Sequence, residues 1–97
     1  MSLSIKLRDG FSDDTVTIKV NGEEVYRKSG VSTDLAISFA DALEAPAEQS
    51  IVQLEVAVEG GPTQTKEVRV RETPFVDVWF VEGEIELRAS KDEVPML

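Results

Sequence analysis

The sequence contains no cysteine and no histidine. Without cysteine, the protein has no disulfide framework, no thiolate metal site and no thiol nucleophile. Without histidine, it also lacks the most common general base and the imidazole metal ligand. Pairs of carboxylates remain, but a packed chain of 97 residues offers no obvious cleft in which two of them would face a substrate. We therefore expect a protein that is not an enzyme.

Positive charge is also scarce. The chain has 10 Lys and Arg against 19 Asp and Glu, a net charge of −9, and residues 29–65 contain no Lys or Arg at all. Nucleic acids and anionic lipids are bound by clustered basic side chains, so we expect neither nucleic-acid binding nor a membrane partner. Solubility explains such an acidic segment, and a cation site or a basic partner is the alternative.

Long apolar runs are missing as well. The first residues, "SLSIKLRDG", alternate and carry charges, unlike the apolar centre of a secretion signal, and no segment approaches the length of a membrane span. We expect a cytoplasmic protein, unless a leader was removed from a longer precursor. A chain of this length fits a single domain over residues 1–97.

What the sequence does contain is alternation of apolar and polar residues. It occurs in residues 3–7, 16–20, 52–58 and 68–70, and turn-forming residues recur roughly every 8–12 positions. This pattern is typical of strands connected by short turns. We predict an all-β fold, a single antiparallel β-sandwich of about seven or eight short strands.

The clearest turn is Asn21-Gly22, which lies between two alternating segments. Both residues tolerate the positive φ angles of a type I′ turn, the usual two-residue hairpin connection. The turn is expected to pair Lys19 with Glu24 and Ile18 with Val25.

The apolar residues within 33–44 fit the period of a helix and also that of a strand. As a helix, the segment would place on one face Leu35, Ala36, Phe39, Ala40 and Leu43. As a strand, the segment would direct these side chains to one side: Val31, Leu35, Ile37 and Phe39. We favour the strand, because hairpins flank the segment and an isolated short helix would need its own docking surface.

The strand, Asn-Gly turn and strand of "DTVTIKVNGEEVYRKSGVSTDL" resemble the opening of prealbumin-like and carboxypeptidase-regulatory-like sandwiches. The general layout is also similar to small uncharacterised bacterial β-sandwich domains. The resemblance covers about the first third of the chain. It implies a non-catalytic accessory or binding module.

Three aspartates in "RDGFSDDT" are candidate metal ligands: Asp9, Asp13 and Asp14. Calcium prefers several hard oxygen ligands from a flexible loop, which closely spaced aspartates and a glycine supply in part. The spacing does not match an EF-hand, and aspartate and glycine also serve the backbone geometry of turns. Calcium is therefore a possible cofactor, and an ordinary turn is the alternative.

Residues 73–90 predict a second hairpin around Glu82-Gly83. The expected pairs are Val81–Glu84, Phe80–Ile85, Trp79–Glu86, Val78–Leu87 and Asp77–Arg88. One face of this hairpin is apolar and is expected to face the core: Val76, Val78, Phe80, Ile85, Leu87 and Ala89. The opposite face has apolar residues too, namely Phe75, Trp79 and Val81.

Those three residues form a candidate partner-binding surface, because aromatic residues are enriched at contacts between proteins. The alternative is that another strand, the "ADALEA" segment or the "VPML" tail covers them. We expect a module that binds itself, as a homodimer, or binds another protein. A calcium-assisted carbohydrate-binding module that uses the three aspartates and Trp79 is the second hypothesis.

Overall fold

The computed structural model describes residues 1–92 of the chain, and this part contains eight strands and no helix. The strands are β1 (Ser2–Leu7), β2 (Asp14–Val20), β3 (Glu23–Val31), β4 (Asp41–Pro46), β5 (Ile51–Val58), β6 (Thr63–Arg69), β7 (Phe75–Val81) and β8 (Glu84–Ser90). The predicted all-β class is confirmed. Within the described residues, no helix is present that is long and apolar enough to cross a membrane.

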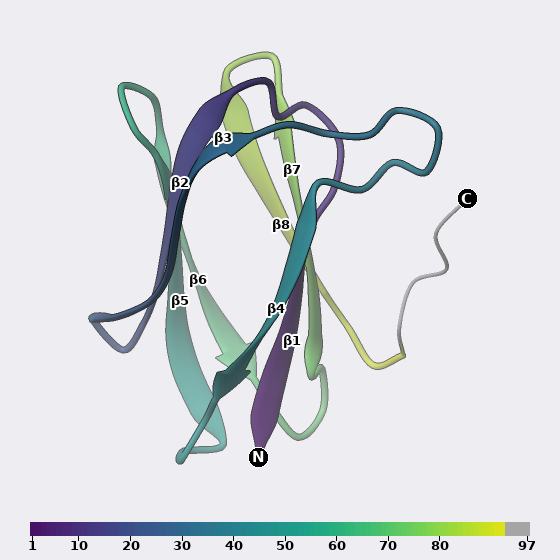
Figure 1. The fold of residues 1–97 in the computed structure, drawn as a ribbon. Coiled ribbons are helices and arrows are strands. Elements are labelled where there is room, and N and C mark those ends of the chain that lie inside the picture. The colour runs from purple at the N-terminus through teal and green to yellow at the C-terminus, as the bar shows by residue number, and fades with distance from the viewer. Residues whose placement is uncertain (93–97) are drawn as a thin grey trace.

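The strands form two four-stranded sheets that pack face to face (Figure 1). Sheet A has the order β4-β1-β7-β8, and sheet B has the order β3-β2-β5-β6. One pair, β1 with β7, is parallel, so the sandwich departs from the purely antiparallel arrangement expected from the sequence. Both strands start at the same end of the sheet, where the Ser4 amide donates to the Pro74 carbonyl at 2.8 Å. No local pattern predicts this pairing, because the two strands are far apart in the sequence.

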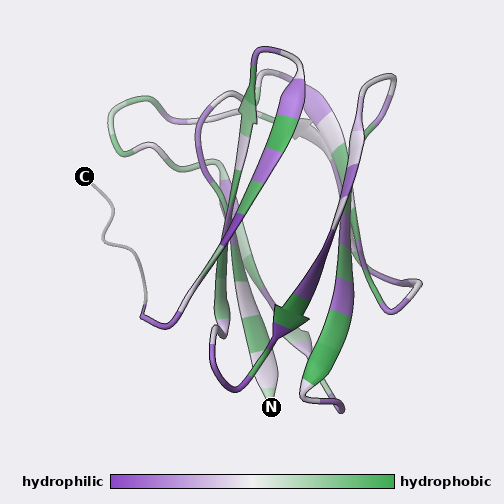
Figure 2. Cartoon of the chain, turned by 180° about the vertical axis from the view of Figure 1, so that it is seen from behind, coloured by the Kyte–Doolittle hydropathy of each residue, from purple (hydrophilic) through white to green (hydrophobic). Residues whose placement is uncertain are grey.

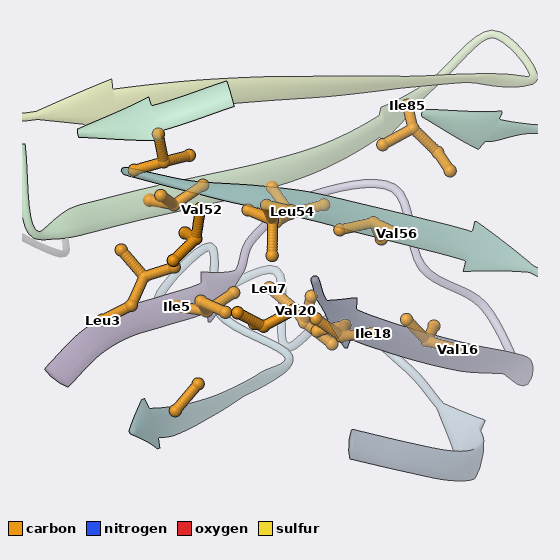
Figure 3. Packing of buried hydrophobic residues seen from close by; sticks show 14 of the residues in the cluster. Leu3, Ile5, Leu7, Val16, Ile18, Val20, Val52, Leu54, Val56 and Ile85 are labelled. Carbon is orange, nitrogen blue, oxygen red and sulfur yellow. The ribbon is translucent and has the colours of Figure 1, made fainter. Parts of the chain in front are cut away.

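The core lies between the sheets and is built by the predicted alternation. Side chains of β1 and β5 are directed into the same apolar layer (Figure 3). Among residues 1–92, the largest fully buried side chains are all aliphatic: Leu3, Ile5, Leu7, Ile18, Leu54, Val16, Val52, Val56, Val68, Val70, Val76 and Val78. Apolar and polar residues alternate along the strands in Figure 2, because successive side chains point to opposite faces of a sheet. Full burial of such a side chain stabilises the fold by about 1.5–3 kcal/mol.

The Asn21-Gly22 turn forms as predicted, with φ of 51° at Asn21 and 82° at Gly22. Lys19 pairs with Glu24, which confirms the register beside the turn. Ile18 pairs with Tyr26 rather than with Val25, because a register shift lies between the two pairs. An extra residue in β3 produces this β-bulge, and the sequence carries no clear signal for it.

Residues 33–44 are neither a helix nor one continuous strand. Strand β4 begins at Asp41, and the preceding residues 32–40 form a loop that projects from the sandwich (Figure 1). Within the loop, Asp34 and Phe39 form an isolated antiparallel bridge, and Ser38 has a φ of 52°. The expected strand is therefore wrong before Asp41. Leu35, which that prediction placed on the same side as Val31, is 83% exposed, whereas Val31 is 3% exposed.

Gly10 is required by its surroundings. Its φ is +99°, and a Cβ atom there would lie 1.6 Å from the carbonyl oxygen of Phe80. Gly22 also has a positive φ, of +82°, but a Cβ atom at Gly22 would meet nothing within 4 Å. A substitution at Gly22 therefore tests the cost of a positive φ alone. A substitution at Gly10 tests that cost together with a steric clash.

We predict that Gly22→Ala lowers the free energy of unfolding by about 1–2 kcal/mol, the cost of a left-handed conformation. Gly10→Ala is expected to cost more, because the β1–β2 loop must also move away from β7. Urea unfolding of the two variants measures the difference. Equal losses would show that the loop moves without cost.

Candidate functional site

The hairpin of β7 and β8 has the predicted register. All five expected pairs are present, and the turn residues Glu82 and Gly83 have φ of 52° and 77°. Val76, Val78 and Ile85 are buried in the core. Phe80, Leu87 and Ala89 are partly buried and pack against it. The core face of the hairpin is thus confirmed.

The opposite face of β7 is less exposed than a free apolar patch would be. Phe75 and Trp79 are half-buried, and Val81 is 48% exposed. The guanidinium carbons of Arg8 and Arg88 lie 5.8 and 5.3 Å from the centroid of the Trp79 ring, within cation–π range. Arginine side chains therefore flank the tryptophan, and Val81 is the most exposed of the three predicted residues.

Of the segments considered as covers for this face, the structure places only one. The "ADALEA" segment contributes to β4, which pairs edge to edge with β1 in the same sheet and does not lie over β7. The "VPML" tail lies outside the described residues.

Arg8 and Asp77 form a buried ion pair on this face. Arg8 is 5% exposed and Asp77 is 2% exposed, and the Arg8 Nη1 and Asp77 Oδ1 atoms are 3.3 Å apart. Arg8 Nε also donates to the Ser38 carbonyl oxygen at 2.8 Å. The Arg8 side chain therefore connects β7 to the 32–40 loop. The sequence analysis missed Arg8, because its contact with Asp77 depends on the parallel pairing of β1 and β7.

The 32–40 loop is held by several further hydrogen bonds. The Thr33 amide donates to the Phe11 carbonyl and the Ala40 amide donates to the Leu7 carbonyl, at 2.9 and 2.8 Å. At the tip, the Ala36 amide donates to Asp34 Oδ1 at 3.0 Å. The loop holds Leu35 and Ile37 in solvent at 83% and 40% exposure. A loop with this many contacts presents its apolar side chains in a defined arrangement.

The three aspartates considered for calcium act within turns. Asp14 Oδ2 accepts a hydrogen bond from the Ser12 amide, and the Asp13 amide donates to Ser32 Oγ. The Asp9 carbonyl accepts from the Phe80 amide. Within residues 1–92, no group of three or more acidic side chains is arranged to hold a metal ion. The structure thus gives the calcium-assisted hypothesis no support.

A second polar cluster connects the two sheets at their β3 and β4 edges. Tyr26 Oη donates to Asp41 Oδ2 at 2.7 Å, and Lys28 Nζ lies 3.3 Å from the same oxygen. Burial raises the pKa of Tyr26 well above its ordinary value, and the Asp41 carboxylate raises it further. Partial burial also raises the pKa of Asp41, but hydrogen bonds from Tyr26, the Ala42 amide and Lys28 outweigh this effect and lower it.

Comparison of the chain with protein-family models, curated proteins and solved structures finds no significant match.

We predict that Asp77→Val lowers the free energy of unfolding by about 3 kcal/mol, because it leaves the Arg8 guanidinium buried without its counter-charge. The double variant Arg8→Met, Asp77→Val is expected to lose less than this single variant, because no buried charge remains. A double-mutant cycle measures this coupling from the urea unfolding of Asp77→Val, Arg8→Met and the double variant. Additive losses would show that the pair is not coupled.

We also predict a pH dependence of stability through Tyr26. Its folded pKa is raised, so its contribution is present below the ordinary value of 10.0 and is lost as the pH rises toward the folded pKa. Asp41 behaves oppositely, because a lowered pKa contributes stability above 3.8 that is lost as the pH falls through the folded value. Tyr26→Phe is expected to cost about 1 kcal/mol at neutral pH, the value of one partly exposed hydrogen bond.

The measurement compares urea unfolding of the wild type and Tyr26→Phe from neutral to alkaline pH. The difference between the two proteins should shrink as the pH rises above 10.0. Tyr26 is the only tyrosine, so the ultraviolet absorbance of tyrosinate reports its ionisation directly. A tyrosine that titrates at its ordinary pKa in the folded protein would contradict the prediction.

Proposed function

We propose that this protein is a non-enzymatic interaction module that associates with a second copy of itself through one end of the outer face of sheet A. The observation that supports the proposal is that β7 and the 32–40 loop, which Arg8 connects, both expose large apolar side chains. Within residues 1–92 the exposed large hydrophobic residues are Met1, Leu35, Ile37, Ile51 and Val81. Leu35, Ile37 and Val81 belong to the elements that meet at Arg8.

Arg8 contacts both β7 and the 32–40 loop. Its amide donates to the Val78 carbonyl at 2.7 Å, and its side chain reaches both the Trp79 ring and the Ser38 carbonyl. The proposed surface therefore extends from Val81 and Trp79 on β7 to Leu35 and Ile37 on the loop. We call this set of four residues the apolar end of sheet A.

A second copy is a suitable partner for such a surface. Two identical patches related by a twofold axis close on each other and do not propagate into fibres. Removal of their apolar area from water contributes about 25 cal/mol per Å². The preformed loop reduces the entropy lost on association. The net charge of −9 opposes association, so salt is expected to strengthen it by screening.

The resemblance to prealbumin-like sandwiches supports the same class of function. A prealbumin-like module of this size would be an accessory or binding domain.

The test compares two exposed residues of equal accessibility on opposite sheets. Val81 and Ile51 are each 48% exposed, the first on β7 of sheet A and the second on β5 of sheet B. We predict that the wild type and Ile51→Asp associate in sedimentation velocity runs as protein concentration and salt increase. Val81→Asp is expected to stay monomeric, because a carboxylate in the contact must be desolvated without a partner.

Leu35→Asp and Trp79→Asp extend the test to the loop and to the aromatic residue. If the wild type is monomeric at every concentration and salt level, the self-association proposal is wrong. If Ile51→Asp weakens association as much as Val81→Asp, the contact lies elsewhere on the molecule.

A further inference from the structure

A pocket of about 310 Å³ lies where the start of β3 meets the end of β4. These strands are the neighbouring edges of the two sheets, and the Tyr26–Asp41 hydrogen bond connects the same edges further along β3. The apolar lining of the pocket comes from both sheets and from the residue after β4: Val20, Val25, Pro46, Ala47 and Val52. Its volume is at the lower end of the range for small-molecule sites, roughly 300–1,000 Å³.

The β-bulge in β3 contributes to this pocket. In a regular strand, the consecutive residues Val25 and Tyr26 would point to opposite faces of the sheet. Here both pack against the core, because Val25 is the extra residue at the register shift between β2 and β3. Tyr26 reaches Asp41 on the other sheet, and Val25 lines the pocket. Bulges often redirect a side chain in this way beside functional sites.

Hydrogen bonds hold the segments on either side of the pocket. The Asn21 amide donates to the Gln53 carbonyl, and the Gln53 amide donates to Asn21 Oδ1, both at 2.9 Å. These two bonds attach the β2–β3 turn to β5. The Ala47 amide donates to the Met1 carbonyl at 2.9 Å, which fixes the chain just after β4. A ligand would therefore enter a preformed site and lose little affinity to the ordering of the protein.

The charged residues of the lining are Glu23 and Glu48, and the lining includes no lysine or arginine. Glu23 pairs with Val20, and paired residues share a face of a sheet, so its side chain starts on the same side as the pocket. Both carboxylates are exposed, and within residues 1–92 neither forms an ion pair with a basic side chain. A concave site with charge of one sign, in a chain of net charge −9, attracts cations.

We propose that this pocket binds a small organic cation, a primary ammonium group on a short alkyl chain. The alkyl chain packs against the apolar lining, and the ammonium group lies at the mouth between Glu23 and Glu48. The inference goes beyond the proposed function and does not depend on it. The pocket lies at the β3 and β4 edges, whereas the proposed contact between copies lies on β7 and the 32–40 loop.

The first test compares four ligands by NMR titration of the ¹⁵N-labelled full-length protein. Hexylammonium is expected to give saturable shifts at the amides of the lining residues. Hexanol has the same chain without the charge and is expected to bind about three- to tenfold more weakly, because it forms no ion pair. Hexanoate is expected to bind more weakly than hexanol. Ethylammonium keeps the charge but buries less alkyl chain, and we expect at least about tenfold weaker binding.

The second test removes the two carboxylates. The variant Glu23→Gln, Glu48→Gln is expected to bind hexylammonium and hexanol equally. The matched control Glu59→Gln, Glu67→Gln makes the same change of net charge at exposed positions outside the pocket lining. It is expected to keep the preference for hexylammonium. The spectra of the free variants show whether the fold is retained, and the ligand series on the wild type remains decisive if a variant fails to fold.

Several results would overturn the proposal. Equal binding of hexylammonium and hexanol to the wild type would show that the carboxylates select nothing. Equal binding of ethylammonium and hexylammonium would show that the apolar lining is not used. An equal loss of preference in both double variants would assign the effect to net charge alone. None of these results depends on the sedimentation of Val81→Asp, so the pocket and the self-association proposal can fail separately.

Discussion

The parallel contact between β1 and β7 is the constraint on which the rest of sheet A depends. Without it, the sheet would separate into the β1–β4 pair and the β7–β8 hairpin, and neither two-stranded piece would be stable alone. The contact also aligns Arg8, just after β1, with Trp79 on β7. The ion pair, the aromatic contact and the anchoring of the 32–40 loop all follow from this alignment.

Arg8 explains how a strand with apolar residues on both faces is accommodated. One face of β7 enters the core, and on the other face the stems and guanidinium groups of Arg8 and Arg88 flank Trp79. Long basic side chains shield apolar surface while their charged ends find partners, here Asp77 and Glu86. This face therefore carries the buried Arg8–Asp77 pair and the exposed Arg88–Glu86 pair, and its most exposed apolar side chains are Val81 on β7 and Leu35 on the loop.

The features that were predictable from the sequence are those that local chemistry decides. Asn21-Gly22 and Glu82-Gly83 both form two-residue turns, and the alternation in residues 3–7 and 52–58 identifies side chains that are buried. At the candidate site, the shared face of Phe75, Trp79 and Val81 followed from the period of two. The contact of Arg8 with Asp77 did not, because it joins residues 69 positions apart. The strand predicted at Leu35 and Ile37 was wrong, because apolar residues on a protruding loop can alternate with polar ones as they do in a buried strand.

The position of β1 also bears on the order in which the chain assembles during synthesis. All four strands of sheet B end by Arg69, whereas the central pair of sheet A also needs the residues up to Val78. Before β7 is in place, the backbone of β1 can pair only with β4. Contacts between distant segments close slowly, so we expect the pairing of β1 with β7 to form late in folding. In this topology, the addition of β7 and β8 to β1 is therefore expected to complete the sandwich.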